Sequence, residues 1–186
     1  MPVYKSKELL GELKQQAQQQ LTSVKALHDA DNDLLNQQPA LNSWSIAQVL
    51  EHLNFYSRSY HARVAEKLSA AGTQQTAFKS GWLGNYFTKM MQPKKDGAVV
   101  NKMSAPKDSR PAEVLDGPAV VGEFIGHQQE LLKLLDTGKD ISVRVPTSIS
   151  SLIKLQAGDT FRFLIAHQQR HLAQARRAAK ALGYKW

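Results

Sequence analysis

Apolar residues recur at steps of three and four along four stretches of the chain, which is the spacing of one face of an α-helix. The stretches span about residues 6–30, 46–70, 111–137 and 159–182. Amphipathic helices of this length bury their apolar faces against one another. The pattern therefore predicts an all-α protein, a four-helix bundle that forms one domain over residues 1–186.

Three helix ends are marked in the sequence, on two of these stretches. Ser45 and Gln48 fit a capping box at the start of the second stretch, and Trp44 just before it is placed to act as a hydrophobic staple. Asp159 is a candidate N-cap for the fourth stretch, which Gly183 is expected to end.

The connections differ in length and character. Residues 71–110 are too many for a tight turn and predict one long crossover between the second and third helices. Within it, the aromatic run 81–87 is expected to form a short helix or to cover one end of the bundle. The third helix is expected to begin near Pro111, with Gly117–Pro118 bending or interrupting it. Residues 141–146 alternate like a strand without a convincing partner, and we expect an extended linker.

Composition narrows the functional classes. The chain has no cysteine, which excludes disulfides, thiolate metal ligands and a cysteine nucleophile. No stretch approaches the roughly 20 apolar residues of a membrane span, and the N-terminal segment lacks the apolar region of a secretory signal. We therefore expect a cytoplasmic protein with no membrane partner.

The charge is strongly positive, at a formal +8 with a pI near 9.7. The basic residues are spread along the chain, with pairs such as Lys94–Lys95 and Arg176–Arg177 far apart, and no nucleic-acid-binding motif accompanies them. The distribution favours a solvated basic surface over a dedicated nucleic-acid face.

Three of the six histidines are predicted to face the bundle interior. His167 and His171 lie four residues apart on one helical face, and His52 lies beside the apolar stripe of the second helix. His61, nine residues further on and about half a turn round, is expected to face solvent. His127, at the edge of the third stripe, could approach this group of histidines, but we expect it to cap a polar boundary.

Imidazoles at i and i+4, with a third from a neighbouring helix, can converge on one divalent ion and leave a coordination position open. That position would hold water or a substrate atom such as a thiolate. An HxxxH pair also arises by chance as surface or core histidine. Since imidazole must be neutral to bind, metal affinity is expected to fall as the pH drops through about 6.5.

Two segments resemble a known family. The run from Trp44 to Leu53, WSIAQVLEHL, resembles the WSxxxxxxHL opening of the second helix in the DinB/YfiT-like superfamily. HQQRHLAQ, from His167 to Gln174, resembles the HxxxHxxQ signature of its last helix. The resemblance covers nearly the whole chain and implies a four-helix bundle, frequent homodimers, and His52, His167 and His171 as ligands of zinc, nickel or a similar ion. It also implies relatives that are metal-dependent transferases or isomerases using low-molecular-weight thiols.

Three neighbours are candidate catalytic residues. Gln174 could hydrogen-bond a ligand histidine, Arg170 could hold an anionic group of a substrate, and Tyr56 could donate to a bound anion. Each has a plain alternative, as surface glutamine, surface charge or core tyrosine.

The sequence thus favours a metal-dependent enzyme of the hydrolase or transferase type. The leading hypothesis is an S-transferase that activates a small-molecule thiol and attacks an electrophile held under residues 81–87. The alternative is a non-catalytic metal-binding module of the stress response. Binding of nucleic acid by the basic surface is a third, weaker hypothesis.

Overall fold

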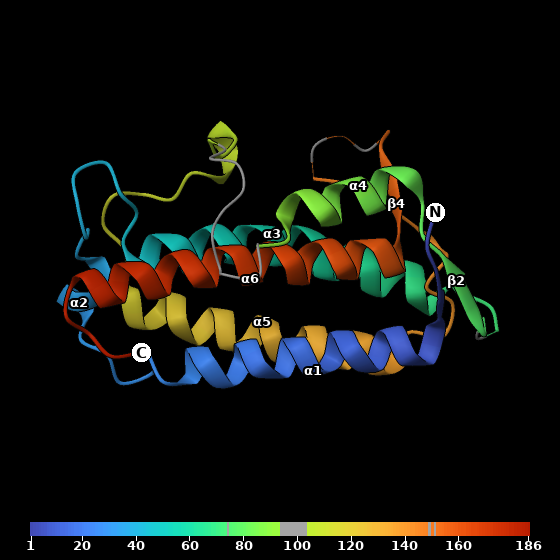
Figure 1. Ribbon diagram of the computed structural model, residues 1–186, viewed down its shortest axis with the longest axis horizontal. Coiled ribbons are helices and arrows are strands. Elements are labelled where there is room, and N and C mark those ends of the chain that lie inside the picture. Colours follow the sequence, from blue (N-terminus) through green and yellow to red (C-terminus); the bar gives the residue numbers. More distant parts are fainter. Residues whose placement is uncertain (74, 94–103, 149, 151) are drawn as a thin grey trace.

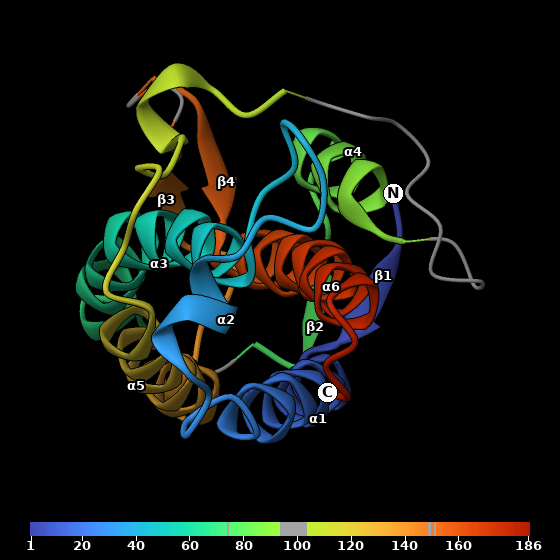
Figure 2. The same cartoon turned by 90° about the vertical axis from the view of Figure 1, so that its left-hand side faces the viewer.

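The computed structural model describes residues 1–73, 75–93, 104–148, 150 and 152–186, and its four long helices run side by side (Figure 1). They are α1 (Ser6–Lys25), α3 (Ile46–Ser69), α5 (Gly117–Thr137) and α6 (Ala157–Ala181). Seen from one end, α3 and α1 each lie beside both α5 and α6 (Figure 2). The predicted four-helix bundle is confirmed.

Shorter elements decorate the bundle. They are α2 (Asn32–Asn36), α4 (Trp82–Met91), the 3₁₀ turn η1 (Lys107–Ser109) and four strands. β1 (Val3–Lys5) pairs antiparallel with β2 (Ala77–Lys79), and β3 (Arg144–Pro146) pairs antiparallel with β4 (Lys154–Gln156). The linker predicted for residues 141–146 is therefore wrong. Its partner strand has only three residues, too few to show alternation in the sequence.

Two predicted helix boundaries are also wrong. The third helix begins at Gly117, and not at Pro111, because the side chain of Asp116 accepts a hydrogen bond from the backbone N–H of Ala119. Pro118 then lies in the first turn, where a missing N–H costs nothing, and so it begins the helix without bending it. The first helix ends at Lys25 and not near residue 30, although Leu27 beyond it is fully buried and prolongs the apolar rhythm.

The second helix begins as predicted. The backbone N–H of Gln48 donates to Ser45 Oγ at 3.1 Å, and the backbone N–H of Ser45 donates to Gln48 Oε1 at 3.0 Å. This reciprocal capping box fixes the first turn of α3 and hence the direction in which His52 leaves the helix.

The long crossover carries α4, which packs along α6 and confirms a short helix in the aromatic run (Figure 1). Asp159 joins the two helices, accepting hydrogen bonds from Ser80 Oγ at 2.6 Å and from the backbone N–H of Gly81 at 2.7 Å. Arg162 Nη1 donates to the same carboxylate at 2.9 Å. Asp159 is therefore not the N-cap of α6, a position held by Gln156. Under this cover, every residue of α6 from 157 to 168 is buried.

The core has two apolar clusters, one toward each end of the bundle. Between them each long helix contributes a buried polar side chain, namely Gln20, Asn54, Gln128 and Gln168. Gln20 Nε2 donates to the carbonyl of Ile165, and Asn54 Nδ2 to that of Val120. The bundle thus changes from apolar to polar at mid-length, the level at which His52 and His167 are also buried.

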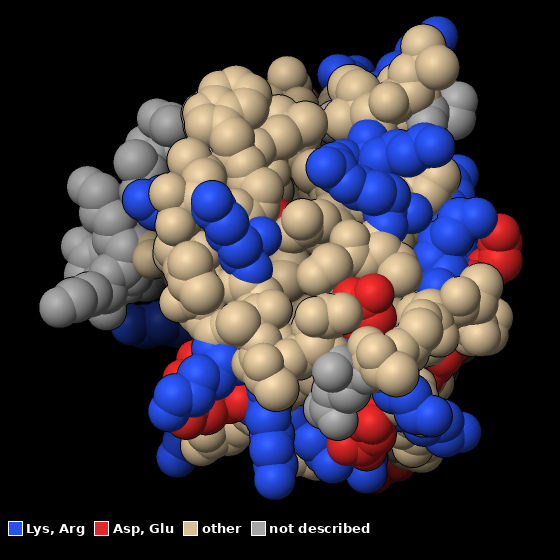
Figure 3. Space-filling view, turned by 90° about the vertical axis from the view of Figure 1, so that its right-hand side faces the viewer, with Lys and Arg blue, Asp and Glu red and all other residues tan. Residues whose placement is uncertain are grey.

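Basic side chains occupy several separate places on the end face that carries the strands, with acidic side chains among them (Figure 3). Lys94, Lys95 and Lys102 lie outside the described residues. No helix in the described part of the chain is long and apolar enough to cross a membrane. The cytoplasmic location stays a prediction.

Candidate metal centre

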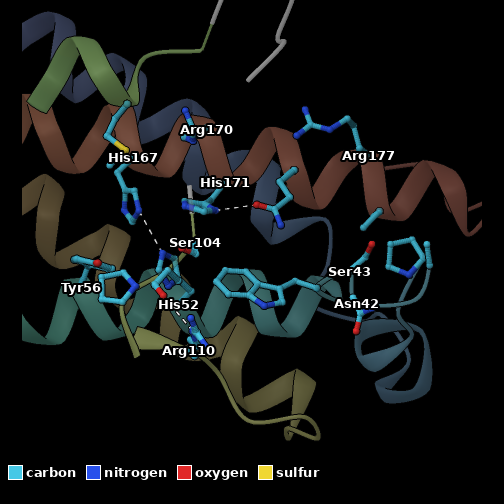
Figure 4. Close-up of a pocket in the computed structure, with 18 of the residues that line it drawn as sticks. Asn42, Ser43, His52, Tyr56, Ser104, Arg110, His167, Arg170, His171 and Arg177 are labelled. Atoms are coloured by element: carbon cyan, nitrogen blue, oxygen red, sulfur yellow. Dashed lines mark hydrogen bonds between the residues drawn. The ribbon is translucent and has the colours of Figure 1, made fainter. Parts of the chain in front are cut away.

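Three histidine rings from two helices meet beside the mid-level of the bundle (Figure 4). The ring centroid of His52, on α3, lies 5.2 Å from that of His167 and 4.7 Å from that of His171, both on α6, and the last two are 4.6 Å apart. One nitrogen from each ring lies within 4.8 Å of the other two.

The spacing of these nitrogens suits a metal ion. The Nε2 atoms of His52 and His167 are 3.4 Å apart. Two nitrogens bound to a tetrahedral ion at about 2.0–2.1 Å are about 3.3 Å from each other. The His52 and His167 nitrogens therefore already have the separation of two ligands of one ion, and the His171 nitrogen lies within 4.8 Å of both.

Hydrogen bonds fix the tautomer of two rings. His52 Nδ1 lies 2.8 Å from the carbonyl oxygen of Ser109, which can only accept, so this nitrogen carries the proton. His171 Nδ1 likewise donates to Gln174 Oε1 at 3.0 Å. In both rings Nε2 then presents its lone pair to the shared centre, the arrangement in which ligand histidines are held in metalloproteins.

His167 differs, because its Nδ1 is buried without a hydrogen-bond partner among the described residues. Its Nε2 faces that of His52, where one proton at most can lie between the two nitrogens. A cation would satisfy both lone pairs at once, so the donor set fits a divalent ion.

The surroundings keep all three rings neutral. Burial lowers the pKa of His52 and, helped by the two other histidines and Arg170, holds that of His167 well below the ordinary 6.5. Burial, and the repulsion that a second protonated ring at His52 would cause, lower the pKa of His171 to about 3. Protons therefore compete with a metal only at a lower pH than the 6.5 expected from the sequence.

The helix register explains why the rings converge. His167 and His171 are one turn apart on the face of α6 that looks toward α3, and His52 lies two turns into α3 behind its capping box. The Trp44 ring packs 5.0 Å from His52 and 6.2 Å from His171 and forms one wall of the site. A staple between Trp44 and the stripe of α3 stays a prediction.

The histidines line a cavity of about 820 Å³ (Figure 4). It opens over the C-terminal half of α6, beyond Met91, where α4 ends. Segments 39–44 and 104–110 supply its other walls. Residues 81–87 do not belong to the described lining, and the expectation that they cover a substrate stays a prediction.

All three candidate catalytic residues line this cavity. The Tyr56 ring lies 4.8 Å from that of His167, and burial raises the pKa of its hydroxyl, opposed by a hydrogen bond with Ser109. Arg170 is joined there by Arg110 and Arg177, which sequence reasoning did not assign to the site. The role of Ser109 was also missed, because a backbone carbonyl carries no side-chain signal.

Among the histidines outside this centre, one differs from its predicted exposure to solvent. His61 is 2 % exposed, so its predicted exposure to solvent is wrong. The face of α3 opposite His52 is covered by α5, and His61 packs there 5.4 Å from His127. His127 contacts Glu123 and Glu130.

A protein-family model matches the part of the chain that carries this arrangement. The model of the DinB superfamily matches residues 8–175, a range that includes the three histidines and Gln174. The chain belongs to the DinB superfamily. YfiT from Bacillus subtilis, described as a probable metal-dependent hydrolase with an unusual four-helix bundle topology, is similar in structure, with a TM-score of 0.55 at 14 % identity. The similarity covers 97 % of this chain and 89 % of YfiT, and it supports the DinB fold. No curated protein matches the chain.

Proposed function

We propose that this DinB-superfamily protein is a metal-dependent enzyme, an S-transferase that joins a low-molecular-weight thiol to an electrophilic small molecule. The observation that carries the proposal is the set of three neutral imidazoles in the wall of an open cavity, with two of the rings held in the metal-binding tautomer.

The donor set suggests which ion would bind. Imidazole suits zinc and nickel among the first-row metals, and we propose one of these as the resident ion. Three neutral ligands leave its charge uncancelled and at least one position open, as in catalytic sites. When bound there, such an ion lowers the pKa of a ligated thiol or water and so supplies a nucleophile at neutral pH.

The cavity favours an organic co-substrate. Its volume of about 820 Å³ is within the range of sites for drug-sized ligands, far more than a water molecule needs. Arg110, Arg170 and Arg177 border it, and guanidinium groups bind carboxylates in a bidentate manner. These side chains would hold the acidic groups of a small thiol with its sulfur toward the histidines.

The rest of the reaction exchanges one bond for another, with Tyr56 and Trp44 beside the reacting atoms. The thiol gives up its proton to solvent, its sulfur forms a bond to the electrophilic carbon, and the bond from that carbon to the leaving group breaks. Burial raises the pKa of Tyr56, so its hydroxyl keeps its proton and can donate a hydrogen bond to an anionic leaving group. The Trp44 ring packs against His52 and His171 and gives this side of the site an apolar wall.

A hydrolase is the second candidate, favoured by the structural similarity to YfiT. In that case water would take the place of the thiol at the same centre. A non-catalytic metal-binding module would need the histidines but neither the arginines nor Tyr56. The homodimer implied by the family resemblance stays a prediction.

Turnover assays separate these functions. Protein without a polyhistidine tag is loaded with zinc or nickel and supplied with glutathione or bacillithiol and a chromogenic aryl halide. The S-transferase gives a thioether product that disappears in His167→Ala and persists in the control His28→Ala, whose side chain is exposed. Cleavage of an activated ester without any thiol would instead establish the hydrolase. Failure of both reactions, despite bound metal, would leave the module.

A further inference from the structure

A second group of metal-binding side chains lies between α3 and α5, on the side of α3 opposite the three-histidine centre. It consists of His61, His127 and Glu130, each offering one ligand atom within 4.8 Å of the other two. His61 follows His52 by nine residues, which is about 13.5 Å along the helix and half a turn round it. The two groups therefore cannot share an ion.

The ligand atoms converge on one carboxylate oxygen. His61 Nδ1 lies 3.1 Å from Glu130 Oε2, and His127 Nδ1 lies 3.7 Å from the same atom. These separations bracket the roughly 3.3 Å between two ligands of a tetrahedral ion. Two imidazoles and one carboxylate are, moreover, a ligand set that proteins use for zinc.

Each ring has only this nitrogen to offer. His127 Nε2 donates to Glu123 Oε1 at 3.2 Å, which leaves the Nδ1 lone pair directed at Glu130. A carboxylate behind a ligand histidine is a common support in metal sites. His61 Nε2 is enclosed and has no hydrogen-bond partner among the described residues, so its Nδ1 is the accessible atom.

The charge around the group also calls for a cation. His127 lies between two carboxylates, 3.2 Å from Glu123 Oε1 and 3.7 Å from Glu130 Oε2. Arg58 pairs with Glu123 and Glu51, so the carboxylate of Glu130 is the negative charge that faces both rings. Burial lowers the pKa of His61, and the hydrogen bond to Glu130 opposes this shift.

We propose that His61, His127 and Glu130 form a second divalent-metal site, suited to zinc, that ties α3 to α5. The side chain of Glu130 is 48 % exposed, so water can complete the coordination. His61 donates its Nδ1 proton to Glu130 in the metal-free form. Binding must move this proton to Nε2, a cost that makes the second site weaker than the three-histidine centre.

The test removes the three-histidine centre by mutation and measures the zinc binding that remains. The variant His52→Ala/His167→Ala, without a tag, is titrated with Zn²⁺ in competition with a chromophoric chelator. The proposal requires one Zn²⁺ per chain, bound more weakly than the first ion of the wild-type protein. It is overturned if this variant binds no zinc.

A matched substitution separates metal binding from simple hydrogen bonding. Adding Glu130→Gln keeps an oxygen acceptor for His61 but removes the charge, and zinc affinity should fall at least tenfold, as loss of a ligand or its support does. Adding His28→Gln, on an exposed histidine, should leave affinity unchanged. Equal affinity with and without Glu130→Gln would refute the site. A second measurement uses the wild-type chain and so does not depend on whether the variants fold. Added zinc should shift the imidazole nitrogen resonances of His61 and His127, and unshifted resonances would also refute the second site.

Discussion

At the scale of single residues, the site depends on which nitrogen of each ring carries the proton. The Ser109 carbonyl and the Gln174 side chain hold the protons of His52 and His171 on Nδ1, so Nε2 is ready to bind before any ion arrives. A ring without such a partner would spend part of its time in the other tautomer or rotated away, and its affinity for metal would be lower.

Gln174 gives a direct test of this orientation. We expect Gln174→Ala to weaken zinc binding at the three-histidine centre by about 10- to 100-fold, the usual effect of removing a supporting partner. The matched control is Gln169→Ala on the same helix, because Gln169 bonds to Gln16 of α1 and not to a ligand. Competition with a chelator measures both affinities, and equal losses in the two variants would show that Gln174 acts only through helix stability.

The lowered pKa values predict how stability depends on pH in metal-free protein. His171 has a pKa of about 3 when folded and about 6.5 when unfolded, so below pH 6.5 the unfolded chain binds the proton first. Stability is therefore full above pH 6.5 and falls as the pH is lowered from there toward 3. Each such histidine contributes at most about 1.4 kcal/mol per pH unit.

Urea denaturation between pH 8 and 4, with chelator present, measures this slope. His171→Gln removes one titrating ring and should flatten the decline between pH 6 and 4 relative to wild type. An unchanged slope in the variant would mean that His171 is protonated as easily in the folded protein as in the unfolded chain.

Sequence reasoning at this scale predicted which side chains share a helical face, but not which faces of a helix are buried. His167 and His171 share a face by spacing alone, and the structure brings His52 to them. His61 was misjudged, because half a turn away from one interface on α3 is another interface with α5. Metal binding by the three histidines stays a prediction.

At the scale of elements, α4 decides where α6 is covered and where it is open. Over the N-terminal half of α6, the carboxylate of Asp159 is held by Ser80, Gly81 and Arg162. Gly84 lets the two helices come this close, since a Cβ there would lie 2.4 Å from Asp159 Cβ. Past Met91 this cover ends and the cavity begins.

We expect Gly84→Ala to destabilise the protein by about 1–3 kcal/mol, the usual range for overpacking, because the held carboxylate cannot move aside. Gly122→Ala in α5 is the control, since its Cβ would meet nothing within 4 Å. Replacing this helical glycine should stabilise the protein by about 0.5–1 kcal/mol. Urea denaturation compares the two, and a stable Gly84→Ala protein would show that α4 is not tightly seated on α6.

The long helices were predictable because each repeats its apolar spacing over five turns or more. The aromatic run in the crossover predicted either a short helix or a cover over one end of the bundle, and the structure has the helix. The two short strand pairs were not predictable, because strands of three residues carry little pattern and β1 pairs with β2 across more than 70 residues of chain. Gly117–Pro118 was misread as an interruption because the cap supplied by Asp116 depends on local geometry.

At the scale of the whole molecule, the bundle places its polar chemistry between two apolar clusters. The four long helices each bury a polar residue at this level, and the candidate centre lies beside it, where α3 and α6 face each other. The apolar clusters on either side fix the two backbones, so the three rings keep their separation without a metal to hold them. The overall architecture followed from the sequence, whereas the cavity did not, because loops far apart in the chain complete its walls.

The most direct test is anomalous diffraction at the zinc edge from crystals grown with zinc, using protein without a tag. The account predicts an anomalous peak about 2.0–2.1 Å from the Nε2 atoms of His52, His167 and His171. If crystals grown at saturating zinc showed no anomalous peak among these three rings, the account would be contradicted. A peak there with the ring of His52 turned away from it would contradict the account as well.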